Sequence, residues 1–283
     1  MSPATYFPEK LWLSKSITFS SPSSPSSSTW IITRKINEKA YPFDEEDAKE
    51  FLEPPSACAT FECTNSESAL QKGVMQVDMQ IPYEGTEYLP ESDRVKQATG
   101  KFSLGMSLEI RAYELLDQTS SKYTPRLRGH MQAKQASDSA FVPEGSIQYL
   151  VYTAVPGIPL GDGCCHRRKD GRNQSDGPYW EFSSEEREEI RTAFHDAYRE
   201  MLFAGVDMPS QGLQNLYWDE GDRRLYIYGP FEPMNTGIRG YSSHTPTDFG
   251  PLVLRSWGLA IAPRGKVDYD VAIADLENSG WVL

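Results

Sequence analysis

The sequence has little cysteine, and what it has is irregularly placed. The four cysteines in 283 residues are Cys58, Cys63, Cys164 and Cys165. They are too few and too poorly spaced for a disulfide framework or a zinc site in a chain of this length. This usage is typical of a reducing compartment, and we expect a cytoplasmic protein.

Positive charge is also scarce: 28 Lys and Arg face 40 Asp and Glu, giving a formal net charge of -12. Nucleic-acid binding rests on clustered Lys and Arg, and an anionic membrane surface would repel an acidic chain. No run approaches the roughly 18 to 20 apolar residues of a membrane span. The first residues also lack the basic and apolar segments of a signal peptide. We therefore expect neither a nucleic-acid nor a membrane partner.

Histidine is the third scarcity, with four residues that show no metal-ligand spacing. We predict no metal site and no cofactor. His166 follows the cysteine pair inside the glycine-rich segment 161–177, which we interpret as an exposed loop without the rigidity that a catalytic nucleophile needs. His195 falls on a predicted helix and is interpreted as a structural residue.

The sequence does contain enough apolar and aromatic residues, 39% and 12%, to build a globular core. Residues 1–56 are hard to place and are treated as an N-terminal extension. Two strand-like stretches, 10–17 and 29–36, flank the Ser/Pro run 20–28, which cannot build a core. An acidic stretch predicts a short helix that ends at the Pro-Pro pair 54–55.

From residue 57 the strand signals sharpen. ATFEC and VMQVDMQI (74–81) are separated by a polar segment that ends in glycine, which predicts a hairpin. Side chains alternate along a strand, so Gln76, Asp78 and Gln80 share one polar face. The opposite face is apolar. We expect the apolar face to pack in the core and the polar face to be available to line a cleft.

One helix and two further strands follow. Apolar residues at helical spacing predict a helix over 103–118, with Glu109 beside the apolar stripe. Strands are predicted in 126–134 and 146–155. A sheet with one helix is the composition of a small α+β lobe, which we assign to 57–152.

The remaining residues, 153–283, offer less helix. Ser183 and Glu186 form a capping-box pattern that opens a long amphipathic helix. This helix leads into a strand at 213–218, a charged turn and a second strand at 225–228. One further apolar helix is expected near the end of the sequence, so this part is predicted to be a reduced helical lobe.

Several of these strings, in this order, resemble a group of fungal kinase-like proteins related to the protein-kinase and aminoglycoside-phosphotransferase folds. The strings are VMQVDMQIPYEGTEYLPESDR, SLEIRAYELL, TPRLRG, YLVYTAVPGIPL, SSEEREEIRTAFHDAYREMLFAGVD, GLQNLYWDE and RLYIYGPFE. They cover roughly residues 57 to 234. The resemblance implies an α+β, bilobal kinase-like fold with a sheet-rich first lobe and a reduced second lobe.

The resemblance also implies where the phosphotransfer residues of an active kinase would fall. The phosphate-anchoring lysine falls on Gln76, while its partner glutamate is retained as Glu109. The catalytic aspartate falls on Ser210, while the magnesium-binding asparagine is retained as Asn215. The metal-holding aspartate falls on the Gly-Pro pair 229–230, which binds no metal. Phosphoryl transfer depends on exactly these charges for positioning and neutralisation of ATP phosphates, so we expect a degenerate, pseudokinase-type member that transfers no phosphate.

Three functions stay open on the sequence alone. In the first, which we favour at this stage, a repurposed cleft binds an apolar small molecule, such as a fungal secondary metabolite, with or without transforming it by cyclisation, isomerisation or dehydration. In the second, the chain is a catalytically inactive pseudokinase that binds a protein partner. In the third, it is an atypical phosphotransferase.

The candidate acid and base residues for the first function are Asp78, Glu109 and His130. Two carboxylates in a poorly solvated site have the raised pKa that acid/base chemistry needs. The alternative is that Glu109 hydrogen-bonds Gln76 and that Asp78 meets solvent. The expected cleft-lining residues are Gln76, Ser210, Asn215, Tyr217, Tyr228, Phe231 and Glu232. An aromatic lining with little charge suits an apolar, uncharged ligand.

Overall fold

The computed structural model describes residues 5–19, 27–234 and 249–283, so most of the Ser/Pro run lies outside the described residues. The chain divides into two compact units. Unit 1 comprises Met1–Ile110 and Arg126–Ala154, and unit 2 comprises Arg111–Pro125 and Val155–Leu283. Both mix helices with strands, which confirms the expected combination of α and β structure.

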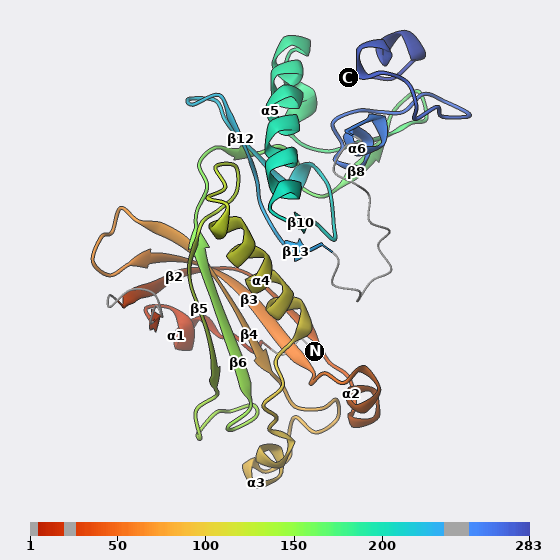
Figure 1. Cartoon of the computed structure of the whole chain (residues 1–283). Helices are drawn as coiled ribbons and strands as arrows, with labels where there is room; N and C mark the ends of the chain where they lie inside the picture. The colour runs from red at the N-terminus through yellow and green to blue at the C-terminus, as the bar shows by residue number, and fades with distance from the viewer. Residues whose placement is uncertain (1–4, 20–26, 235–248) are drawn as a thin grey trace. The chain divides into compact units, whose positions relative to one another are not determined.

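Unit 1 is built on a six-stranded antiparallel sheet (Figure 1) with the strand order β1-β2-β3-β4-β6-β5. The strands are β1 (Ser16–Phe19), β2 (Ser28–Tyr41), β3 (Ser56–Asn65), β4 (Lys72–Gln80), β5 (Leu127–Lys134) and β6 (Ser146–Thr153). Its helices are α1 (Glu9–Trp12), α2 (Glu45–Phe51), α3 (Glu91–Arg94), the 3-10 turn η1 (Val95–Gln97) and the first half of α4 (Leu104–Gln118). The predicted hairpin, helix and two later strands of this region are confirmed, as is the short acidic helix.

Strands β1 and β2, both before residue 56, belong to this sheet, so the described part of the predicted N-terminal extension is not separate from it. β2 pairs along the length of β3, from Trp30 opposite Asn65 to Tyr41 opposite Ser56. The segment before β1 covers the apolar face, where the Trp12 ring stacks on Phe61 with centroids 5.7 Å apart. The sequence boundary at 56 therefore differs from the compact unit, because strand pairing and ring packing join distant segments.

Both faces of β4 are buried. Val77 and Met79 lie in the apolar core, as expected. The polar face is covered as well: Asp78 is 7% exposed and Gln80 is 1% exposed. Gln80 Nε2 donates to the carbonyl of Gln97 in η1 at 2.7 Å. The expectation that Asp78 meets solvent is therefore wrong, because α4 and the segment before it close over this face of the sheet.

Unit 2 holds one long helix and several short strand pairs. Its helices are α5 (Ser184–Phe203) and α6 (Pro251–Ser256), with 3-10 turns η2 (Pro178–Glu181), η3 (Leu213–Asn215), η4 (Ile273–Asp275) and η5 (Glu277–Ser279). Its strands are β7 (Ile158–Pro159), β8 (Cys165–Arg167), β9 (Asn173–Ser175), β10 (Val206–Asp207), β11 (Leu216–Asp219), β12 (Arg224–Ile227) and β13 (Glu232–Pro233). Among the described helices, none combines the length and apolar character that crossing a membrane requires.

The capping box that opens α5 is confirmed. Glu186 N donates to Ser183 Oγ at 3.2 Å, and Ser183 N donates to Glu186 Oε2 at 3.0 Å. The apolar side of α5 carries Phe194, whose ring lies 5.1 Å from Trp257. This packing ties the end of the chain to the long helix and forms the centre of the core of unit 2.

Two sequence predictions in unit 2 are corrected. Residues 213–215 form a 3-10 turn, and the strand begins only at Leu216. The segment interpreted as a loop, 161–177, contains the antiparallel pair β8 and β9. Its polar side chains hydrogen-bond one another and so stabilise a hairpin that has no apolar periodicity in the sequence.

Candidate functional site

The candidate residues fall into two groups, one in each unit. Gln76, Asp78, Glu109 and His130 belong to unit 1. The other candidates belong to unit 2, and they are Ser210, Asn215, Tyr217, Tyr228, Phe231 and Glu232. Each group is described by itself.

The position where the resemblance places a phosphate-anchoring lysine is held by a neutral amide whose donors are both used. Gln76 Nε2 donates to Glu109 Oε1 at 3.1 Å and lies 3.1 Å from the Tyr152 hydroxyl. An amide nitrogen has only two hydrogens. The predicted contact between Gln76 and Glu109 is present, and it leaves the amide no donor for an anionic ligand.

Asp78 lies two residues further along β4, in a buried polar setting. Ser56 Oγ donates to Asp78 Oδ2 at 3.2 Å. Burial raises the pKa of the Asp78 carboxyl to about 7, the charge of Glu53 adds to the rise, and hydrogen bonds from Ser56 and Ser103 oppose it. The raised pKa matches the expectation for an acid/base residue, but its 7% exposure leaves little surface for a substrate.

A buried acceptor lies next to Asp78 in the sheet. Gln148 is the direct cross-strand neighbour of Asp78 on β6. Gln148 Nε2 donates to Ser107 Oγ of α4 at 3.1 Å, whereas Gln148 Oε1 is buried without a hydrogen-bond partner among the described residues. A protonated Asp78 would supply a donor beside it. Ser56, Asp78 and Gln148 form a buried polar row, which the hydrogen bond to Ser107 connects to α4. This connection is a structural role.

His130 lies on β5 and is exposed. Its cross-strand neighbour is Leu150 of β6, and Leu150 in turn is opposite Gln76 of β4. One complete strand therefore separates His130 from the amide of Gln76. Glu109 is the candidate acid or base residue whose carboxylate accepts a hydrogen bond from the amide of Gln76.

In unit 2, Asn215 is used by the backbone of a neighbouring turn. Its Nδ2 donates to the carbonyl oxygens of Tyr228 and Gly229, at 3.2 and 3.0 Å. Asn215 Oδ1 is buried without a hydrogen-bond partner among the described residues. Because both amide hydrogens of Asn215 bind backbone carbonyls just after β12, Asn215 stabilises this turn.

The positions expected to carry a base and a metal ligand hold no carboxylate. Ser210, at the position of the base, is exposed. Phe231, which directly follows the Gly-Pro pair 229–230, is completely buried, and its ring lies 5.3 Å from that of Tyr113. Glu232 of β13 is opposite Asp207 of β10, a pairing that the sequence did not predict. The side chain of Asp207 accepts a hydrogen bond from Met208 N at 2.7 Å. In the described part of the chain, no three His, Cys, Asp or Glu residues gather in a way that could hold a metal ion.

Two tyrosines form a half-buried pair on the hairpin of unit 2. Tyr217 and Tyr228 have ring centroids 5.2 Å apart with an interplanar angle of 37°. Burial raises the pKa of Tyr217, so its hydroxyl stays protonated at neutral pH. The pair offers an aromatic surface without charge, and its role in lining a cleft stays a prediction.

Tyr152 and Ser56 are the contact residues that sequence reasoning missed. Tyr152 is one of several apolar or aromatic residues in a run, and nothing in the run marks the one that reaches Gln76. Ser56 lies before the first strand signal at residue 57. The alternation of β6 places Tyr152 on the same face as Leu150, the cross-strand neighbour of Gln76. This alternation is the signal in the sequence that indicates the contact between Tyr152 and Gln76.

No family model matches the sequence, and no curated protein matches it. Solved structures of low identity do. The kinase PK-1 of Cydia pomonella granulovirus has 14% identity and a TM-score of 0.40 over 73% of this chain and 56% of its own. Vaccinia related kinase 3 has 13% identity and a TM-score of 0.35 over 77% and 50%. The ROP18 kinase domain, solved with AMP-PNP and sucrose, has 11% identity and a TM-score of 0.43 over 82% and 61%.

The chain spans between 50% and 61% of the length of these three solved chains. All three of these solved structures are kinases or kinase domains.

Proposed function

We propose that this chain is a kinase-like binding protein that does not transfer phosphate from ATP. The observation that carries the proposal is the hydrogen bond from Gln76 Nε2 to Glu109 Oε1. Phosphoryl transfer rests on cationic groups and metal ions that neutralise the phosphates. A neutral amide with both hydrogens engaged supplies none of that charge.

The proposal has two further supports, in unit 2. The amide hydrogens of Asn215 are bound to the carbonyls of Tyr228 and Gly229. The position that the resemblance gives to the catalytic aspartate is Ser210, and a neutral hydroxyl is a poor proton acceptor. A single substitution would not restore lysine, base and metal ligand together.

We expect no incorporation of radiolabelled phosphate when the protein is incubated with labelled ATP and either magnesium or manganese. The Gln76→Lys variant should be equally inactive, because it restores one charge and neither the base nor the metal ligand. A protein kinase with an intact catalytic lysine and aspartate serves as the positive control. Stoichiometric labelling of the wild-type protein would overturn the proposal and favour an atypical phosphotransferase.

A second candidate function, binding of an apolar small molecule with or without its transformation, is favoured by the pair of Tyr217 and Tyr228. Their tilted rings offer uncharged aromatic surface, and aromatic surface with few polar groups is typical of small-molecule sites. We place it second because two of the three proposed acid and base residues are engaged inside the protein: Asp78 is buried and Glu109 is bound to Gln76.

A thermal-shift screen separates the two candidates. A ligand present at 100 times its dissociation constant stabilises the folded state by about 2.7 kcal/mol. If the second candidate holds, an apolar metabolite should raise the melting temperature and the double variant Tyr217→Ala/Tyr228→Ala should abolish the rise. If no apolar compound in the screen shifts the wild-type protein, the small-molecule function loses its support.

A further inference from the structure

Positive charge is concentrated in one short hairpin of this acidic protein. The twelve residues 164–175 contain Arg167, Arg168, Lys169 and Arg172 and only one carboxylate, Asp170, whereas the whole chain has a net charge of -12. β8 and β9 form the two strands, and the charged residues lie in and beside the turn between them. We call β8, β9 and this turn, residues 165–175, the basic hairpin.

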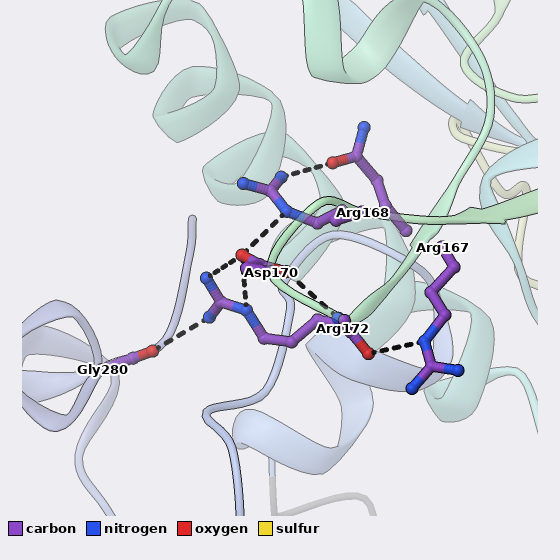
Figure 2. A network of polar contacts seen from close by, with 7 residues as sticks. Arg167, Arg168, Asp170, Arg172 and Gly280 are labelled. Carbon is purple, nitrogen blue, oxygen red and sulfur yellow. Dashed lines mark hydrogen bonds and ion pairs between the residues drawn. The ribbon is translucent and has the colours of Figure 1, made fainter.

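Asp170 neutralises only part of this charge (Figure 2). Its Oδ2 accepts from Arg172 Nη2 at 2.8 Å and from Arg168 Nε at 3.2 Å. These hydrogen bonds, Arg172 first, hold the pKa of the Asp170 carboxyl well below its usual value. Arg172 Nη1 also donates to the carbonyl of Gly280 at 3.3 Å. The network stabilises the hairpin. Among the described ion pairs, Asp170 pairs with Arg168 and Arg172 and not with Arg167 or Lys169, the other two basic residues of the turn.

Arg167 and Arg264 both approach the turn at Gly171. Both guanidinium groups lie within 4 Å of the place where a side chain at Gly171 would begin, with Nη2 of Arg264 at 3.8 Å and Nη2 of Arg167 at 3.9 Å. Gly171 has a φ of 79°, a conformation that favours glycine, so no side chain stands at this point of the turn. Arg167 Nε donates to the carbonyl of Gly171 at 3.3 Å.

The converging pair has no anion of its own. Neither Arg167 nor Arg264 forms an ion pair with a carboxylate among the residues that the structure describes. Both side chains are exposed, as are Lys169 and Lys266 close to them in sequence. Two like charges that approach each other without an anion repel, and an anion placed between them removes the repulsion. This arrangement is suited to binding an anion from outside the chain.

We propose that the basic hairpin, together with Arg264, binds a phosphorylated peptide segment of a partner protein. A phosphorylated side chain carries a charge of about -1.5 to -2 at neutral pH, which matches two guanidinium groups, whereas a single carboxylate would neutralise only one. Guanidinium groups also bind phosphate oxygens through paired hydrogen bonds. Acidic neighbours of the phosphorylated residue would lie near Lys169.

A peptide fits this surface better than a long polyanion or a membrane. Salt screens charges beyond about 8 Å at physiological ionic strength, so a short peptide experiences mainly the basic hairpin. A nucleic acid or an anionic bilayer extends further and meets the remainder of a chain whose net charge is -12. The proposal extends the proposed binding function to a named surface in unit 2. It fails separately from that function, because the phosphate-transfer assay does not involve the hairpin.

The test uses the full-length protein and a fluorescein-labelled peptide with one phosphoserine flanked by two acidic residues on each side. We expect fluorescence anisotropy to show at least about tenfold tighter binding than for the same peptide with serine, since hydrogen bonds to charged groups are stronger than those to neutral groups. Arg167→Gln and Arg264→Gln should each weaken binding of the phosphorylated peptide by about tenfold. Both side chains are exposed, so the melting temperature should not change.

Lys122→Gln is the matched control, because it removes one exposed positive charge from unit 2 outside the basic hairpin. It should change the affinity less than about twofold if only the local charge matters. Equal binding of the two peptides, or equal loss in the control variant, would overturn the proposal. So would tighter binding of a single-stranded oligonucleotide or of phosphatidylserine vesicles that is lost in the Arg167→Gln and Arg264→Gln variants.

Discussion

Replacing Phe231 with alanine should lower the free energy of unfolding by about 3 to 5 kcal/mol. Phe231 is 0% exposed, and its ring packs edge-on against Tyr113 at 5.3 Å. Truncation removes the buried ring and leaves a cavity that its neighbours fill only in part. In a chain of this size, the loss corresponds to a fall in melting temperature on the order of 10 °C. Thermal and urea denaturation of the two proteins would measure it.

Phe203→Ala is the matched control for this experiment. It makes the same chemical change in the same unit, but Phe203 is 85% exposed. Its effect should lie within about 0.5 kcal/mol of zero. A loss below about 1 kcal/mol in Phe231→Ala would contradict the structural role and would return Phe231 to the group of ligand-lining residues.

Replacing Asp78 with asparagine should remove a pH dependence of stability. Burial raises the pKa of this carboxyl from 3.8 to about 7. Between these two values, the folded protein keeps a proton that the unfolded chain has lost. The contribution of Asp78 is therefore most favourable below pH 3.8. It falls by about 1.4 kcal/mol per pH unit as the pH rises, or roughly 4 kcal/mol in all, and is constant above pH 7.

Asparagine does not titrate, so Asp78→Asn should gain stability relative to the wild-type protein as the pH rises from about 4 to 7. Urea denaturation at several pH values gives the difference between variant and wild type, in which the other titrating groups largely cancel. Asp138→Asn, an exposed site in the same unit, is the control and should show little change. If the difference for Asp78→Asn does not vary with pH, the carboxyl is ionised in the folded state and the buried polar row is misinterpreted.

Periodicity in the sequence predicted most of the regular elements. The helix over 103–118 and the capped helix after Ser183 carry strong signals, because both their apolar spacing and the cap are local properties. The signals were weak where structure depends on distant partners. The hairpin in 161–177 has no apolar pattern, and its strands are stabilised by the Asp170 network and by a contact with Gly280, more than a hundred residues away in sequence.

The candidate site was predicted in part. The contact between Gln76 and Glu109 followed from placing a strand and a helix in the order that the resemblance implies, and it is present. The environment of Asp78 did not follow, because alternation along a strand tells which side chains share a face and not what covers that face. The hydrogen bonds of Asn215 and Tyr152 depend on partners that lie far away in the sequence. Asn215 binds the carbonyl of Gly229, 14 positions away, and the Tyr152 hydroxyl binds the amide of Gln76, 76 positions away.

By itself, the sequence determined the kinds of residue available to this protein. Position 76 holds glutamine where the resemblance implies lysine, and residues 226–231 contain no carboxylate. In an otherwise acidic chain, positive charge gathers in the basic hairpin. Only the tertiary structure decided what those residues do. It used the donors of Gln76 and Asn215 in internal hydrogen bonds, buried Asp78 under α4, and brought Arg264 next to Arg167. The physical reason is that hydrogen bonds, burial and the approach of charges depend on distance in space, which the local pattern of a sequence does not record.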